Sequence, residues 1–364
     1  MSGVALELHD ALDPAPRAEW DAFLAGADRQ HPRQDPRFAA VERAEGARPL
    51  FALARRDGRV VAVALLSLRP HRLIPGAFAE ASALSGPVAD DAGTLGAMLD
   101  ALAAHPRLRR TVGRLRVSPY WIGPAAAEAA ALLAARGFRT AEAETLRRTG
   151  LVPLAGGREA RIARLSKSAR RELRRGERQG VAVAAVTDPA EALECLASLE
   201  RLRRSRGLAP LSRAGFEAGF PEIHGPGDLG VLLAARHEGR LAGSLMLYRG
   251  RDVAHGRHFA PEPELLRSLS NLRISPALWL AGMDWAEARG CRALDVEGWR
   301  ADVAPGTPRH AIYKYKSELG PEETPRVAEH YLPLNPVLHA PGFAPQRLRR
   351  AAGRLRRRLR EGVA

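Results

Sequence analysis

Lysine is rare in this sequence, and its placement is the first pointer to chemistry. The chain has 364 residues, with 53 arginines but only three lysines, one at position 167 and two in the run Tyr313-Lys314-Tyr315-Lys316. Lysine is a compact charge whose pKa shifts readily on burial, whereas arginine is a permanently charged fork. A lysine can therefore stabilise a developing oxyanion or donate to a leaving oxygen. The alternative is an exposed strand, with Lys314 and Lys316 on one face and the tyrosines on the other.

A second group of positive charges is expected on a helix over residues 166–179. Its basic residues recur at i, i+3, i+4 and i+7, which places them on one helical face. They are Lys167, Arg170, Arg171 and Arg174. Such a face fits phosphate groups, because lysine and arginine both form charge-assisted hydrogen bonds to phosphate oxygens. The alternative is a solvated surface helix.

Other familiar catalytic patterns are missing from the sequence. The chain has no Gly-x-x-x-x-Gly-Lys-Ser/Thr loop, no Gly-x-Gly-x-x-Gly after an expected strand, and no Gly-x-Ser-x-Gly elbow. His255 and His258 lie on an expected strand with no carboxylate or cysteine cluster beside them, so we expect no metal site. Either histidine could act as a general base or face a phosphate, and the alternative is a place in the core.

Composition narrows the class of protein. Hydrophobic residues make up 46% of the chain, which excludes wholesale disorder. The sequence has no apolar run of about 18 residues and no apolar signal core near its start, and its two cysteines cannot build a disulfide framework. We therefore expect a cytoplasmic protein. The net charge of +15 predicts phosphate-bearing partners, and the alternative is a compositional bias toward arginine.

The order of expected elements repeats in the two halves of the chain. Each half reads as two helices, a strand–turn–strand hairpin, a strand, a helix and a strand. The hairpins span residues 49–68 and 229–248 and occupy equivalent places. The sequence therefore predicts a duplicated α/β domain.

The end of the chain is strongly basic. Over residues 346–360, leucines fall on one helical face and eight arginines fill the rest. This pattern predicts a basic amphipathic helix. It would either lie on an anionic membrane surface, at the inner face of the membrane, or pack one side on the body of the protein.

Short motifs follow one another in a fixed order along the chain, and together they resemble a known family. They are Gln34-Asp35-Pro36 before Phe38, Gly58 to Ala62, Ser85-Gly86-Pro87-Val88, Leu115 to Pro119, Gly137-Phe138, the helix from Lys167 to Gly180, Leu294-Asp295-Val296-Glu297-Gly298, and Ile312 to Gly320. In this order and spacing they are similar to the Fem family of aminoacyl-tRNA-dependent peptidyltransferases. That family adds amino acids to the stem-peptide lysine of peptidoglycan precursors.

The resemblance implies an α/β fold with two acetyltransferase-like (GNAT) domains, each a mixed sheet flanked by helices. It also implies that the chain returns to the first domain after completing the second. The expected parts are residues 1–148 for the first domain, 149–321 for the second, 322–345 for the return and 346–364 for the basic C-terminal helix.

The resemblance also implies site residues. The family motif aromatic-Lys-x-x-aromatic-Gly is matched from Tyr315 to Gly320, with leucine at the second aromatic position. Lys316 is then the catalytic lysine, and Tyr315 lines the same channel. Asp295 and Gly298 match the family's Leu-Asp-Leu-Gly-Gly, in which Glu297 replaces one glycine.

Two positions depart from the family pattern. Where family members that act on nucleotide-linked muropeptide have a basic and an acidic residue, this chain has Glu42 and Ser118. These two departures weaken what the resemblance implies about a peptidoglycan acceptor and about a carboxylate general base.

Three functions follow from these observations. The first is an aminoacyl transferase with aminoacyl-tRNA as co-substrate, no bound cofactor and an amine acceptor that is lipid- or nucleotide-linked. The second is an acyl-CoA-dependent GNAT N-acyltransferase acting on an envelope polysaccharide, a lipid or a small amine. The third is a non-catalytic basic binder. For the transferases, we expect substrate or phosphate contacts from the basic helix face and from Tyr313, Lys314, His255, His258, Asp295 and Gly298.

Overall fold

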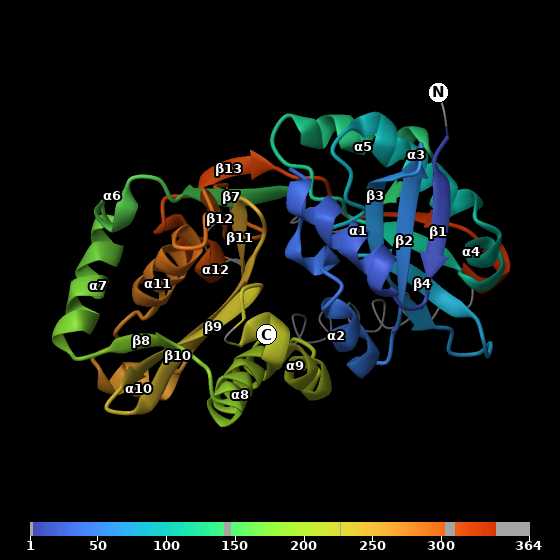
Figure 1. Cartoon of the computed structure of the whole chain (residues 1–364). Coiled ribbons are helices and arrows are strands. Elements are labelled where there is room, and N and C mark those ends of the chain that lie inside the picture. The colour runs from blue at the N-terminus through green and yellow to red at the C-terminus, as the bar shows by residue number, and fades with distance from the viewer. Residues whose placement is uncertain (1–2, 142–146, 226, 303–309, 340–364) are drawn as a thin grey trace, which may run out of the picture.

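The computed structural model describes residues 3–141, 147–225, 227–302 and 310–339, and it shows two lobes side by side (Figure 1). Each lobe is built on a seven-stranded mixed sheet with helices packed on it, so the expected duplication of a GNAT-like domain is confirmed. Within the described residues, no helix is both long enough and apolar enough to span a membrane.

The first lobe contains the N-terminal third of the chain. Its elements are β1 (Ala5–His9), α1 (Pro14–Gly26), η1 (Pro32–Gln34), α2 (Phe38–Ala44), β2 (Arg48–Arg56), β3 (Arg59–Pro70), β4 (Phe78–Ala83), α3 (Ala92–Ala104), α4 (Pro106–Thr111), β5 (Arg114–Val117), α5 (Ala125–Ala135) and β6 (Arg139–Thr140).

The second lobe follows without returning to the first until near the end. Its elements are β7 (Arg148–Pro153), α6 (Gly157–Arg164), α7 (Lys167–Arg178), β8 (Ala182–Ala185), α8 (Pro189–Ser205), α9 (Arg213–Gly219), the π-helical turn η3 (Phe220–His224), β9 (Gly230–His237), β10 (Arg240–Arg249), β11 (Val253–Pro261), α10 (Pro263–Ser268), α11 (Ser275–Glu287), β12 (Ala293–Asp295), α12 (His310–Ser317) and β13 (Glu322–Pro325).

The two sheets have matching strand orders. The first sheet runs β1-β2-β3-β4-β5-β14-β6, in which β14 is His330–Pro333, and the second runs β8-β9-β10-β11-β12-β7-β13. Both predicted hairpins are confirmed, as β2–β3 and β9–β10. Each turns through a two-residue loop with both residues at positive φ, Asp57-Gly58 and Glu238-Gly239, which is the twist that tight hairpins require.

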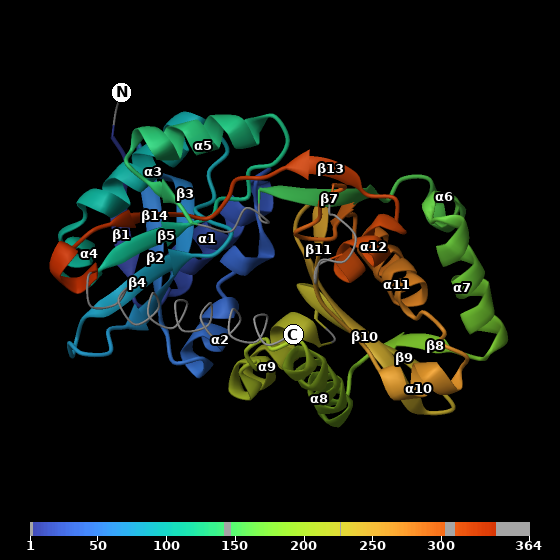
Figure 2. The same ribbon diagram turned by 180° about the vertical axis from the view of Figure 1, so that it is seen from behind.

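The return to the first lobe comes a few residues later than the expected position 322. Strand β13 still pairs with β7 in the second sheet, and only β14 (His330–Pro333) enters the first sheet, between β5 and β6 (Figure 2). The basic helix expected at 346–364 lies outside the described residues.

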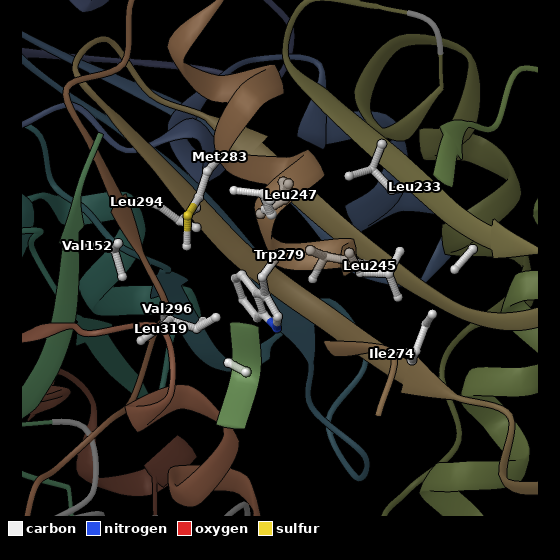
Figure 3. Packing of buried hydrophobic residues seen from close by; sticks show 14 of the residues in the cluster. Val152, Leu233, Leu245, Leu247, Ile274, Trp279, Met283, Leu294, Val296 and Leu319 are labelled. Atoms are coloured by element: carbon white, nitrogen blue, oxygen red, sulfur yellow. The ribbon is translucent and has the colours of Figure 1, made fainter. Parts of the chain in front are cut away.

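Apolar side chains stabilise both lobes and the contact between them. In the second lobe, Trp279 and Met283 of α11 pack over Leu245 and Leu247 of β10 (Figure 3). A second apolar cluster joins the lobes, because α2 and α9 pack together and the Phe38 ring meets the Tyr248 ring edge-on at 5.2 Å. This shared core fixes the lobes relative to each other, so residues from both can build one site.

The segment that carries two of the three lysines is helical, so the strand alternative for Lys314 and Lys316 is wrong. Its Tyr-Lys-Tyr-Lys order imitates a two-residue period, but the inward-facing residues are Tyr313 and Lys316, which are three apart as on a helix. Lys314 is exposed and Lys316 is buried, so the two lysines do not share a face.

Candidate active site at the domain interface

Two neighbouring parallel strands bring ionisable residues to the domain interface. Strands β11 and β12 run parallel, and their last paired residues are His255 and Asp295. Both are completely buried. A buried ionisable group without hydrogen-bond or charge partners destabilises the fold. The partners of these two residues therefore indicate their roles.

Asp295 is held by three donors. Its carboxylate accepts hydrogen bonds from the Tyr120 hydroxyl at 2.8 Å, from the Glu297 backbone N–H at 2.7 Å and from the Thr149 hydroxyl. Burial, together with the charge of Asp295, raises the pKa of Tyr120 well above its usual value, so the phenol stays a donor. Because Tyr120 comes from the first lobe, Asp295 ties the lobes together and orients the backbone of Glu297.

Glu297 places a carboxylate beside a histidine of the first lobe. Its Oε1 lies 3.7 Å from His31 Nε2, and its Oε2 lies 3.8 Å from Arg257 Nη1. Burial alone would raise the pKa of Glu297, but the contact with His31 and the charges of Arg257 and Arg326 outweigh it and hold the pKa well below its usual range. The carboxylate is therefore anionic at neutral pH.

A buried loop positions His31. The His31 Nδ1 accepts a hydrogen bond from the Arg33 backbone N–H at 3.1 Å and caps the short helix η1. Gln34, completely buried, anchors that helix by donating to the Leu84 carbonyl and accepting from the Leu65 N–H, each at 2.8 Å. The His31 ring then lies with its centroid 4.1 Å from that of His255.

Lys316 reaches the same cluster from α12. It is 9% exposed, and its ammonium donates to the backbone carbonyl of Glu297. Burial lowers the pKa of Lys316 to about 8, although Glu297 and Asp295 partly offset this effect. An amine with such a pKa exchanges a proton near neutral pH, which suits it to donate to a leaving group or to a developing oxyanion.

The other residues of the lysine motif surround Lys316. The Tyr315 ring packs against Phe259 at 5.1 Å, and burial raises the pKa of Tyr315. Tyr313 is buried, and its backbone carbonyl accepts from Trp299 Nε1. Lys314, by contrast, points away as an exposed residue.

The remaining predicted residues of the second lobe lie close by. His258 is half-buried on β11, and burial followed by the charge of Arg257 lowers its pKa well below the usual value. Between His258 and Gly256 the strand bulges, so Arg257 has no partner position on β10. Gly298 adopts a positive φ of 51°, directly after Glu297 at 48°.

The predicted basic residues of α7 line one side of that helix. Ser166 caps the helix by accepting from the Ala169 N–H. The basic residues line an open hollow of about 270 Å³ on the outer side of the second lobe, with one further arginine (Figure 1). They are Lys167, Arg170, Arg171, Arg174 and Arg178. The start of α7 lies beside the end of the lysine motif, because the Ser166 backbone N–H donates to the Glu318 carbonyl at 2.9 Å.

Several residues of the cluster around Glu297 are not predicted from the sequence. His31 and Tyr120 belong to the other lobe, and nothing in their local sequence marks them. Arg257 and Arg326 are two of many arginines. Glu297 had a visible signal, since it stands where the similar family has glycine. Among the described residues, His31, His255 and Glu297 are also the group that comes nearest to a metal-ligand set, with their ligand atoms within 4.8 Å of one another.

Comparisons with known proteins support this architecture. Residues 163–316 match the acetyltransferase (GNAT) domain family. No curated protein matches the chain. The structure of FemX is similar at a TM-score of 0.75 and 16% identity, covering 92% of this chain and 99% of FemX.

Two further solved structures share the arrangement. A tandem GNAT protein from the clavulanic acid biosynthesis pathway is similar at a TM-score of 0.51 and 16% identity, covering 91% of this chain and 99% of that one. L-PGS from Bacillus licheniformis is similar at a TM-score of 0.52 and 14% identity, covering 92% and 96%. The resemblance expected from the ordered motifs is therefore confirmed in the fold: this chain has the tandem GNAT architecture of FemX.

Proposed function

We propose that this protein is an acyltransferase that forms an amide on an amine acceptor at the domain interface, with aminoacyl-tRNA as the donor. The observation that carries the proposal is the buried Lys316 at the junction of two GNAT-like domains. GNAT and Fem-like transferases join an acyl donor to an amine, and the architecture is theirs.

The reaction needs little beyond positioning and charge stabilisation. The amine nitrogen bonds to the acyl carbon, the bond from that carbon to the donor oxygen breaks, and the proton lost by the amine is taken up by the leaving oxygen. The intermediate carries an oxyanion, which a nearby ammonium stabilises. Lys316 is the group we assign to this role, either on the oxyanion or as the donor to the leaving oxygen, and Tyr315 lines the channel beside it.

The basic face of α7 supports a phosphate-rich donor. Five cationic side chains line one hollow there, and such a face binds a nucleic acid backbone without reading its sequence. The acceptor we propose is an amine of a cell-envelope precursor, lipid- or nucleotide-linked, as in peptidoglycan synthesis.

Glu42 stands where family members that act on nucleotide-linked muropeptide have a basic residue, so its surroundings matter for the acceptor. It is buried, accepts from the Ser67 hydroxyl at 2.5 Å and lies 3.5 Å from Arg33. With these internal partners it does not present a free charge to a substrate, unlike the basic residue of the family pattern.

An acyl-CoA donor is the second candidate. The match of residues 163–316 to the acetyltransferase (GNAT) family favours it, because it covers the lobe that contains Lys316. In that case a thiolate replaces the leaving oxygen and takes up the proton.

Parallel binding titrations at physiological salt distinguish the donors. Purified protein is titrated with charged tRNA, uncharged tRNA and acetyl-CoA, at a salt concentration that suppresses unspecific binding of polyanions to a protein of charge +15. Saturable binding of charged tRNA that is tighter than binding of uncharged tRNA supports the first donor. Saturable binding of acetyl-CoA alone supports the second, and binding of neither contradicts both.

A further inference from the structure

One end of the first sheet carries exposed apolar side chains. Among the residues that the structure describes, the large apolar side chains that are exposed are Leu73, Leu208 and Val337. A single exposed apolar residue is ordinary, whereas several at one place mark a surface that meets a partner. Leu73 and Val337 are 72% and 73% exposed, and both follow strands of the first sheet. Where those strands end therefore decides whether the two residues belong to one surface.

The strand order brings these two residues to the same end of the sheet. Leu73 lies in the loop from β3 to β4, and Val337 follows β14. Because β4 runs parallel and β14 antiparallel to the strand between them, β5, the start of β4 and the end of β14 lie at one end. The Gly113 N–H donates to the Phe78 carbonyl, and the Leu334 N–H donates to the Gly113 carbonyl. The segments that carry Leu73 and Val337 are thus tied to the same residue.

The loop between β3 and β4 is a structured turn that projects beyond β4 (Figure 1). The buried His71 accepts hydrogen bonds at Nδ1 from the N–H groups of Leu73 and Ile74, at 3.2 and 3.1 Å. The His71 N–H donates to the Ala77 carbonyl, and the Ala77 N–H donates to the Ile74 carbonyl. Leu73 is therefore held in the solvent by a closed network of backbone hydrogen bonds.

Arginines surround the exposed apolar residues. Arg69 and Arg72 belong to the approach to the β3–β4 turn, and Arg109 and Arg110 lie in the last turn of α4. All four are exposed, and within the described residues none of them forms an ion pair. Asn335 connects α4 to the segment after β14, because its side-chain amide donates to the Arg109 carbonyl at 3.1 Å. Unpaired positive charge thus borders the apolar side chains.

We call this region the sheet-end surface and define it as residues 69–77, 106–113 and 334–339. None of these three segments contains an aspartate or a glutamate. The Asp10 carboxylate lies nearby, but it is shared between Arg107 at 2.6 Å and Arg48 at 3.1 Å. The surface therefore combines apolar side chains with an excess of positive charge.

We propose that the sheet-end surface docks the protein on an anionic lipid membrane. Leu73 and Val337 enter the headgroup layer, and the arginines contact lipid phosphates, which is how a basic surface with apolar side chains binds a bilayer. The chain continues from this surface into a sequence with eight arginines between positions 346 and 360, which adds charge of the same sign.

Docking at this surface is compatible with the candidate active site but independent of its reaction. Tyr120, which donates to Asp295 at the domain interface, follows the far end of β5. The sheet-end surface lies at the near end of that strand. The proposal therefore goes beyond amide formation and does not rest on it.

Vesicle binding by the full-length protein tests the proposal. Sedimentation at physiological salt compares vesicles of pure phosphatidylcholine with equimolar phosphatidylcholine and phosphatidylglycerol. We expect binding to the anionic vesicles only, and about a ten-fold loss of affinity in the double variant Leu73→Ser with Val337→Ser, which no longer buries two apolar side chains. The matched control is Leu208→Ser, which removes an exposed leucine of the second lobe and should bind as wild type does. Thermal melting checks that both variants fold.

A fluorescent label separates docking from general attraction to a basic protein. An environment-sensitive dye is attached to Leu73→Cys or to Leu208→Cys, with wild type as the blank because Cys195 and Cys291 are buried. We expect anionic vesicles to shift the emission of the dye at position 73 to shorter wavelength and to leave the dye at position 208 unchanged.

Three results would overturn the proposal. They are no binding to the anionic vesicles, equal binding by wild type and the double serine variant, and vesicle binding without an emission shift at position 73. The last two would assign the attraction to the net charge of +15 instead of the sheet-end surface.

Discussion

The two sheets pair their parallel strands alike but end them differently. In the first sheet, β4 and β5 finish on Ala83 opposite Val117, both apolar and buried. In the second, the parallel pairing of β11 with β12 finishes on His255 opposite Asp295, although β11 itself continues to Pro261. Only one of the two matching positions therefore carries ionisable side chains.

The first lobe still contributes to the second lobe's site, but from its loops. Tyr120 follows β5 by three residues and donates to Asp295, and His31 precedes η1 and lies against His255. The second lobe thus provides polar residues where its parallel strands pair, and the first lobe provides loop residues that contact them.

The largest effect is expected for Lys316→Met. The substitution keeps the length of the side chain but removes the ammonium, and we expect amide formation to fall about 100- to 1000-fold, the usual value of one oxyanion donor. Single-turnover rates and thermal melting measure the two consequences. We expect no rescue by Lys316→Arg, because the broad guanidinium does not fit a buried place built for an ammonium. Wild-type turnover by Lys316→Met would contradict the assignment.

Replacement of the strand-end residues compares the lobes directly. Asp295→Asn removes the charge that three donors surround, and we expect a loss of about 3 kcal/mol in the free energy of unfolding. Val117→Ala at the equivalent position only removes apolar atoms and costs about 1–2 kcal/mol. Urea unfolding measures both variants. If Asp295→Asn lowered the free energy of unfolding by less than Val117→Ala does, Asp295 would not stabilise its strand end more than Val117 stabilises the matching one.

Lys316 should give the stability of the second lobe a pH dependence of its own. The pKa of Lys316 is about 8 in the folded protein against an ordinary 10.5, because burial disfavours the ammonium. Between these values the unfolded chain holds the proton and the folded chain does not, so stability rises with pH in this window. The penalty is present in full below pH 8 and is relieved by pH 10.5.

Comparison with Lys316→Met separates the contribution of Lys316 to the pH dependence of stability from that of other titrating groups. Relative to Lys316→Met, we expect the unfolding free energy of wild type to gain up to about 3 kcal/mol between pH 8 and 10.5. Parallel curves for the two proteins over this range would show that Lys316 keeps an ordinary pKa.

How much of this architecture can be predicted from sequence depends on distance along the chain. Both hairpins are predictable, because Asp57-Gly58 and Glu238-Gly239 are local turn signals. The α7 face is predictable from its helical spacing. The cluster around Glu297 is not, because His31 and His255 are more than 200 residues apart and meet only when the lobes dock. The lysine segment misleads, because alternating residue types imitate a strand while its buried residues follow a helix.

The smallest effect concerns the basic face of the second lobe. Arg170→Ala with Arg174→Ala should weaken tRNA binding several-fold and reduce its salt dependence by about one or two released ions. The control removes two exposed arginines of α4 in the first lobe, Arg109→Ala with Arg110→Ala. Filter binding over a range of salt concentrations compares the pairs. Equal losses of tRNA affinity in both double variants would show that the α7 face contributes only general surface charge.

The most direct test of the domain-interface site uses the three lysines as reporters. The protein is labelled with an amine-reactive ester, with and without donor, and each lysine is quantified by mass spectrometry. We predict that bound charged tRNA or acetyl-CoA protects Lys316 but leaves the exposed Lys314 unchanged, and that labelling of Lys316 rises with pH around 8. Labelling of Lys316 that is the same with saturating donor as without it would contradict the placement of the reaction at the domain interface.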